Sequence, residues 1–132
     1  MKRLLTLCLL ALLTCFATSA LAADATNLVG TWEGTPSVHG PKVGYRTGKL
    51  VLTIVEQQGN AFHGVKTYQM PGPKKERTEK FSGTIRADGQ ILIADHDEGF
   101  MLGDLTKGGD MELQYGHAGK NAISVYVLLK KK

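Results

Sequence analysis

Short apolar segments alternate with glycine-containing turns from residue 28 to the end of the chain, and this pattern constrains the fold more than any other feature. Several segments alternate internally, as where Met111, Leu113 and Tyr115 are separated by single polar residues. A period of two is typical of a strand with one buried face, and glycine-containing pairs suit tight hairpin turns. We therefore expect eight strands, at residues 28–34, 49–57, 61–69, 79–87, 90–95, 100–106, 110–115 and 122–130.

A flat meander of eight strands would leave two exposed edges, and closing it removes both. We predict an all-β fold, an eight-stranded antiparallel up-and-down β-barrel, with a β-sandwich of the same strands as the alternative. Two connections exceed hairpin length, at residues 35–48 and 70–78. In an up-and-down order both follow odd-numbered strands, so we expect them at the same end. That end is the expected mouth, with the first loop as a candidate lid.

The first 22 residues have the features of a secretory signal peptide. Lys2 and Arg3 precede an apolar run of 13 residues, and small residues around Ala20 and Ala22 suit cleavage after Ala22. The run is shorter than the roughly 20 residues of a membrane-spanning helix, and no comparable run follows. We expect a signal peptide at residues 1–22 and a single β-barrel domain at residues 23–132. The mature protein would be periplasmic or secreted, with no transmembrane segment.

Composition excludes several functional classes. Cys8 and Cys15 both lie in the segment expected to be removed, so the mature chain has no cysteine chemistry. Removing Lys2 and Arg3 lowers the basic count from 16 to 14 against 12 acidic residues, and the net charge falls from +4 to +2. Such a charge does not indicate a nucleic-acid partner. Nucleophile-elbow, phosphate-loop and zinc-protease motifs are absent, so we expect no enzyme, no catalytic residue and no cofactor.

Asp95, His96, Asp97 and Glu98 form the most reactive-looking stretch of the chain. In an extended strand the two aspartates point to one face and the other two residues to the opposite face, so no face presents all four. We interpret the stretch as the polar tip of a hairpin and expect no metal site. A divalent-metal site here, or a carboxylate pair such as Glu56 with Asp95 inside the barrel, remains an alternative.

Aromatic residues are the candidates for ligand contacts. An eight-stranded barrel is just wide enough to be filled by its own side chains or to hold one small ligand. Tyrosines combine an apolar ring with a hydroxyl that needs a partner, which suits the rim of a pocket. We predict a ligand site that includes Tyr45, Tyr68, Phe100 and Tyr115.

The segment VGTWEG at residues 29–34 carries a family resemblance. A Gly-x-Trp near the start of the first strand, followed by a long loop and a meander, resembles the calycins, the group of lipocalins and avidins. The chain is also similar to small exported bacterial proteins of lipocalin-like plan. The resemblance implies that Gly30 and Trp32 lie at a closed barrel end, with Lys130 over the tryptophan. It also implies room for a small apolar ligand.

Two functions follow as expectations. The first is an exported, lipocalin-like protein that binds a small, largely apolar ligand at the end bearing residues 35–48 and 70–78. The second is a non-enzymatic cell-envelope interaction or structural protein with a filled barrel. Strands 49–57 and 122–130 are apolar on both faces and would then contact an envelope protein or a second copy.

Overall fold

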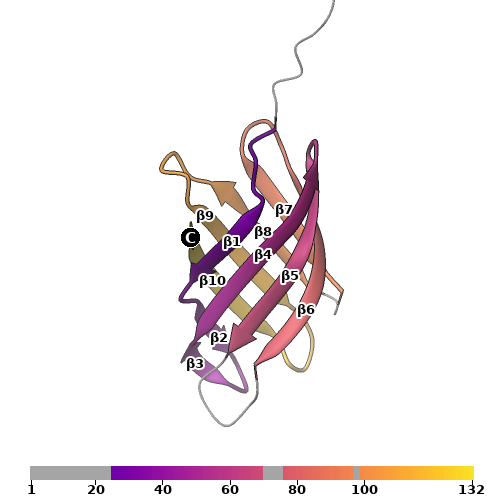
Figure 1. The fold of residues 1–132 in the computed structure, drawn as a ribbon. Coiled ribbons are helices and arrows are strands. Elements are labelled where there is room, and N and C mark those ends of the chain that lie inside the picture. Colours follow the sequence, from indigo (N-terminus) through magenta and orange to yellow (C-terminus); the bar gives the residue numbers. More distant parts are fainter. Residues whose placement is uncertain (1–24, 70–75, 97–98) are drawn as a thin grey trace, which may run out of the picture.

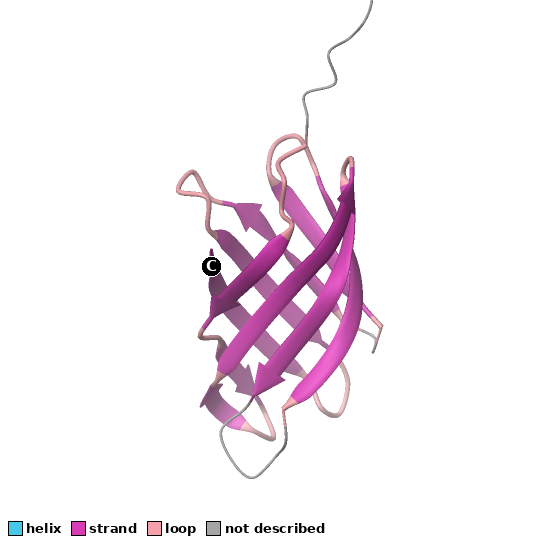
Figure 2. Cartoon of the chain, in the orientation of Figure 1, coloured by secondary structure: helices cyan, strands magenta, loops and turns pink. Residues whose placement is uncertain are grey.

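The computed structural model describes residues 25–69, 76–96 and 99–132, and these residues form a closed antiparallel β-barrel without a helix (Figures 1 and 2). The predicted eight-stranded barrel is confirmed: β1 and β4 to β10 make a closed ring in which β1 pairs with β10. The expected signal peptide lies outside the described residues. Along the described ranges, no helix is long and apolar enough to cross a membrane.

The described residues form ten strands, eight in the ring and two in an added hairpin. Most begin and end within two residues of the expected bounds, because the turn glycines set where each strand stops. The strands are β1 (Gly30–Gly34), β2 (Ser37–Gly40), β3 (Gly44–Thr47), β4 (Lys49–Gln58), β5 (Ala61–Gln69), β6 (Arg77–Ile85), β7 (Gln90–Asp95), β8 (Phe100–Leu105), β9 (Met111–His117) and β10 (Ile123–Lys131).

The barrel closes through the last residues of β10. Trp32 pairs with Lys131 and Glu33 with Lys130, while β4 pairs with the other edge of β1. The Lys132 backbone N–H extends this contact by donating to the Thr31 carbonyl at 3.0 Å. Closure leaves neither β1 nor β10 with an open edge along these residues, which removes the aggregation risk of a flat sheet.

The long first connection is a hairpin rather than the irregular loop that we expected. β2 pairs with β10 from Tyr126 to Ser124, and β3 folds back onto β2. The cause is that β1 covers only the end of β10, so the backbone groups at its start need another partner. Pro36 and Pro41 flank β2 directly, and prolines argue against a strand, so the sequence did not indicate these two four-residue strands. The hairpin lies at the lower end of the barrel in Figure 1.

Inward side chains fill the half of the barrel opposite this hairpin. Alternate residues of every ring strand contribute, so the observed core confirms the period of two. The buried cluster includes Leu28, Trp32, Leu52, Ile54, Phe62, Phe81, Ile85, Ile91, Ile93, Met111, Leu113, Val127 and Leu129. Gly64 and Gly103 also face inward, where an added Cβ would collide with the carbonyl oxygens of Thr53 and Glu112. These glycines let neighbouring strands bend closely around a small interior.

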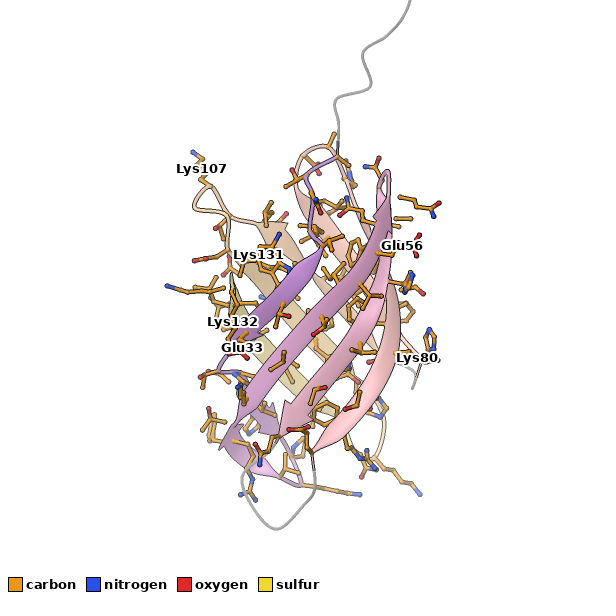
Figure 3. All side chains as sticks on the ribbon, viewed as in Figure 1. Glu33, Glu56, Lys80, Lys107, Lys131 and Lys132 are labelled. Atoms are coloured by element: carbon orange, nitrogen blue, oxygen red, sulfur yellow. The ribbon has the colours of Figure 1, made fainter. Side chains whose placement is uncertain are left out.

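Trp32 lies at the end of this core, with only 2 % of its surface exposed. Its indole Nε1 donates to the Leu28 carbonyl at 2.8 Å. The lysine over its ring is Lys131, with Nζ 5.4 Å from the ring centroid, in place of the Lys130 that we expected. Side chains alternate along β10, so Lys131 shares the parity of inward Leu129. Figure 3 places Lys131 and Lys132 beside β1. Gly30 fits here because an added Cβ would meet the Lys131 side chain.

Replacing Trp32 with alanine should lower the free energy of unfolding by about 3–5 kcal/mol, because it empties a core position and removes the indole hydrogen bond. Urea denaturation followed by circular dichroism measures the change. Tyr45→Ala is the matched control, since Tyr45 is 87 % exposed and its loss should cost no more than about 0.5 kcal/mol. Equal losses for both variants would contradict the assignment of Trp32 to the core.

Candidate functional site

A cavity of about 550 Å³ occupies the barrel end that bears the β2–β3 hairpin. One part of its lining is apolar and consists of Pro36, Val38, Leu50, Met101, Ile123 and Val125. The other part is polar and includes Lys66, Tyr68, Arg77, Glu79 and Tyr115. The volume lies within the range of small-molecule sites. Both expected mouth segments reach it, through Pro36 and Arg77, although residues 70–75 lie outside the described ranges.

Lys66 stands at the floor of the cavity, where the apolar core ends. It follows the inward residues Phe62 and Gly64 on β5, and it pairs with Leu52 on β4 and Glu79 on β6. Only 5 % of its surface is exposed. A lysine is almost never this buried without a partner, because removing its charge from water is costly. Its neighbours must therefore supply compensating charge.

Two carboxylates supply that charge. The Lys66 Nζ lies 2.8 Å from Oδ2 of Asp95 and 3.0 Å from Oε2 of Glu79. The carboxylate side chains are themselves 1 % and 12 % exposed. The remaining oxygens are also used: Gly99 N–H donates to Asp95 Oδ1 at 2.7 Å, and the Tyr68 hydroxyl donates to Glu79 Oε1 at 3.0 Å. Lys66, Asp95 and Glu79 are called the charge cluster below. Each of the four carboxylate oxygens in this cluster has a hydrogen-bond or ion-pair partner.

The protonation of Lys66 is secured by these partners. Burial alone would lower the pKa of Lys66, but hydrogen bonds and charges from Asp95 and Glu79 outweigh burial and raise it above the ordinary lysine value. Lys66 therefore stays an ammonium at neutral pH. An ammonium has no free electron pair, so Lys66 serves as a cation and a donor rather than as a nucleophile.

Two tyrosines flank the ammonium. Lys66 Nζ lies 5.6 Å from the ring centroid of Tyr68 and 5.2 Å from that of Tyr115. Both distances allow cation–π attraction, which is stronger where water is excluded. Tyr68 and Tyr115 also pack against the apolar core. The rings thus connect the core to the cavity and hold Lys66 between its partners.

Asp95 has two roles, one through its backbone and one through its side chain. The Asp95 N–H donates to the Gly99 carbonyl at 3.1 Å, as expected near a hairpin tip. Its side chain, however, points into the barrel, because Asp95 shares the parity of Ile91 and Ile93 on β7. The sequence analysis favoured a polar hairpin tip for Asp95 and kept a position inside the barrel, paired with Glu56, as the alternative. Asp97 and Glu98 lie outside the described residues.

The predicted ligand residues fall into two groups. Tyr68 and Tyr115 line the cavity. Tyr45 lies on β3 against the His39 ring, with centroids 4.5 Å apart, and Phe100 is 59 % exposed on β8. Neither Tyr45 nor Phe100 lines this cavity.

The carboxylate that lies inside the barrel near Asp95 is Glu79, whereas the alternative in the sequence analysis was Glu56. Glu56 is exposed on the outside of the barrel (Figure 3), where it accepts hydrogen bonds from Gln58 at 2.7 Å and pairs with His63 at 3.3 Å. Those contacts lower the pKa of Glu56. Asp95 and Glu79 are held near each other because both contact the Lys66 ammonium. Among the described residues, no three His, Cys, Asp or Glu side chains gather as metal ligands.

Lys66 and Glu79 were not predicted, although a signal for both exists in the sequence. Lys66 lies four residues after Phe62, and Glu79 lies two residues before Phe81, so each shares the inward parity of a buried phenylalanine. A charged residue at an inward position of an alternating strand indicates a buried ion pair or a site.

Comparison with known proteins adds no relative. No protein-family model matches the chain, and no curated protein matches it either. The closed eight-stranded barrel is compatible with a calycin-like fold.

Replacing Lys66 with methionine should lower the free energy of unfolding at pH 7 by about 3–5 kcal/mol, because two buried carboxylates would lose their cation. Urea denaturation measures the loss. Lys49→Met is the matched control: Lys49 pairs with Glu33 at 3.3 Å on the surface, and its loss should cost at most about 1 kcal/mol.

The difference in stability between wild type and Lys66→Met should depend on pH in a defined way. Because the folded pKa of Lys66 is raised, its stabilising contribution is complete below the ordinary lysine value of about 10.5 and is lost as pH rises through the folded pKa. The stability difference between wild type and Lys66→Met should therefore stay constant from neutral pH to about pH 10 and shrink above it. A difference that shrinks between pH 7 and pH 9 would contradict the charge cluster.

Proposed function

We propose that the chain is an exported, calycin-like barrel protein that binds one small, largely apolar molecule in the cavity between the charge cluster and the β2–β3 hairpin. The observation that carries the proposal is the divided interior: core side chains fill one half of the barrel, while the other half keeps a cavity of about 550 Å³. Eight-stranded barrels can hold one small ligand in such a space.

The lining supports binding of an apolar body. Val38, Leu50 and Val125 present aliphatic surface on neighbouring parts of the wall. Each charged group of the charge cluster already has an oppositely charged partner, so the main interaction left for a ligand is burial of apolar surface, at roughly 25 cal/mol per Å². The Tyr68 and Tyr115 rings add aromatic surface beside this wall.

The cluster favours binding over catalysis. Lys66 is held protonated, and each oxygen of Asp95 and Glu79 already accepts a hydrogen bond. A general base needs a carboxylate oxygen within reach of a substrate proton. These oxygens are instead committed to holding the fold, so the cluster supports a positioning and structural role.

Filling the cavity should abolish ligand retention. Val125 is a half-buried lining residue, and Val125→Trp would occupy the cavity with an indole. Native mass spectrometry of gently purified protein should show a small-molecule mass on wild type that disappears on denaturation, and should show Val125→Trp bare. The matched control is Val55→Trp, because Val55 is 53 % exposed on β4; it should keep the ligand. Retention by Val125→Trp, or a bare wild type, would contradict the proposal.

A second candidate function is self-association through the outer face of β7 and β8. Leu92 and Leu102 are cross-strand partners and are 41 % and 56 % exposed, and Phe100 on the same strand as Leu102 is 59 % exposed. Neighbouring exposed apolar residues of this size indicate a contact surface. The expected surface on 49–57 and 122–130 is interrupted, because Glu33, ion-paired to Lys49 and Lys132, lies on β1 between β4 and β10.

A charge at the centre of this patch should prevent association. Sedimentation velocity should detect a concentration-dependent dimer of wild type that Leu102→Lys converts to monomer. Val55→Lys is the matched control, since Val55 has nearly the same exposure, 53 % against 56 % for Leu102, but lies on β4. A monomeric wild type at all concentrations would contradict this second function.

A further inference from the structure

Tyr115 differs from Tyr68 and Tyr126, whose hydroxyls are hydrogen-bonded within the barrel. The Tyr68 hydroxyl donates to Glu79 at 3.0 Å, and the Tyr126 hydroxyl donates to Glu112 at 2.9 Å. Tyr115 lines the cavity, yet its hydroxyl makes no hydrogen bond with any residue in the described ranges. A partly buried phenol normally has a partner, so this hydroxyl is available to a bound molecule.

The position of Tyr115 is fixed on two sides. Its ring lies over the Lys66 ammonium, 5.2 Å from Nζ to the centroid. Gly99 is buried against it, and a Cβ at Gly99 would collide with both the Tyr115 ring and Asp95. The glycine therefore permits the close packing that orients the ring. Burial, followed by the nearby Asp95 charge, raises the pKa of Tyr115, so its hydroxyl keeps the proton that it would donate.

The charge cluster disfavours a charged ligand group. One ammonium faces two carboxylates, so Lys66, Asp95 and Glu79 together carry one excess negative charge. An anionic group beside the cluster would be repelled by that excess. A cationic group would find each carboxylate oxygen in use and the two tyrosine faces already occupied by Lys66. Arg77 is exposed at the rim, where water screens its charge.

Tyr115 has apolar neighbours in the cavity wall, while its hydroxyl lies beside Gly99. Tyr115 pairs with Met101 on β8 and with Val125 on β10, and both line the cavity. A molecule that reaches the Tyr115 hydroxyl must therefore rest on apolar surface. Its polar atom must also be an acceptor, because the phenol offers a proton.

We propose that the ligand is an uncharged amphiphile in which an apolar chain lies on Val125 and Met101 and a neutral oxygen, such as that of a ketone or an ester, accepts the Tyr115 O–H. This assignment rests on the proposed function and narrows it from any apolar molecule to one chemical class. Tyr115 is then the residue that selects the head group.

Three probes with the same ten-carbon chain test the head group: 2-decanone, decanoate and decylammonium, each titrated at pH 7 by isothermal titration calorimetry. Wild type should bind 2-decanone more tightly than both charged probes. Tyr115→Phe keeps the ring and removes the donor, so it should weaken 2-decanone binding roughly three- to tenfold, as expected for one hydrogen bond. It should leave the weaker binding of the charged probes nearly unchanged.

The matched control is Tyr126→Phe, which removes a hydroxyl from the outer face of β10 and should leave all three affinities unchanged. Decanoate or decylammonium binding as tightly as 2-decanone, or no effect of Tyr115→Phe, would overturn the ligand class while the proposed function stands. Failure of all three probes to bind wild type would overturn both. The comparison among probes uses wild type alone, so it decides the question even if a variant fails to fold.

Discussion

The ion pairs of Lys66 with Asp95 and Glu79 are the interaction on which the rest of the interior depends. A buried ammonium is tolerated only where opposite charge and hydrogen bonds replace its water. Three strands, β5, β6 and β7, each contribute one member of the cluster, so the pairing also fixes how these strands align. The apolar core ends at this level of the barrel. Between this level and the β2–β3 hairpin the interior can stay open, because the groups of the charge cluster already have partners.

The same arrangement separates the apolar core from the cavity within a small domain. Leu28, Trp32 and the other buried apolar residues supply a core at one end, and the β1–β10 pairing closes the sheet around it. The cavity end contributes less apolar burial, and the charge cluster and two tyrosine rings rigidify it instead. A rigid wall favours binding because less conformational entropy is lost when a ligand enters. The β2–β3 hairpin adds Val38 and completes that wall from outside the ring.

Much of this fold could be predicted because the decisive information is local. The alternation of Met111, Leu113 and Tyr115, and the glycines at the turns, define strands of nearly the observed lengths. The hairpin was missed because a four-residue strand such as β2 is stabilised by the free edge of β10 rather than by its own sequence. The prediction named Lys130 as the lysine over Trp32, one residue before the observed Lys131. The resemblance through Gly-x-Trp does not say which residues of the last strand point inward. The inward position of Leu129 does, because Lys131 lies two residues after it.

The sequence by itself determined the eight strands of the ring, its antiparallel order and which face of most strands is buried, since these follow from alternation, turn residues and the cost of open edges. It also placed Tyr68 and Tyr115 on strands near the predicted mouth. Only the tertiary structure decided that Lys66, Glu79 and Asp95 meet, that the Tyr115 hydroxyl has no hydrogen-bond partner among the described residues, and that a cavity remains at the hairpin end of the interior. The physical reason is that parity is a property of one strand, whereas register and curvature arise only when the strands pair around the barrel.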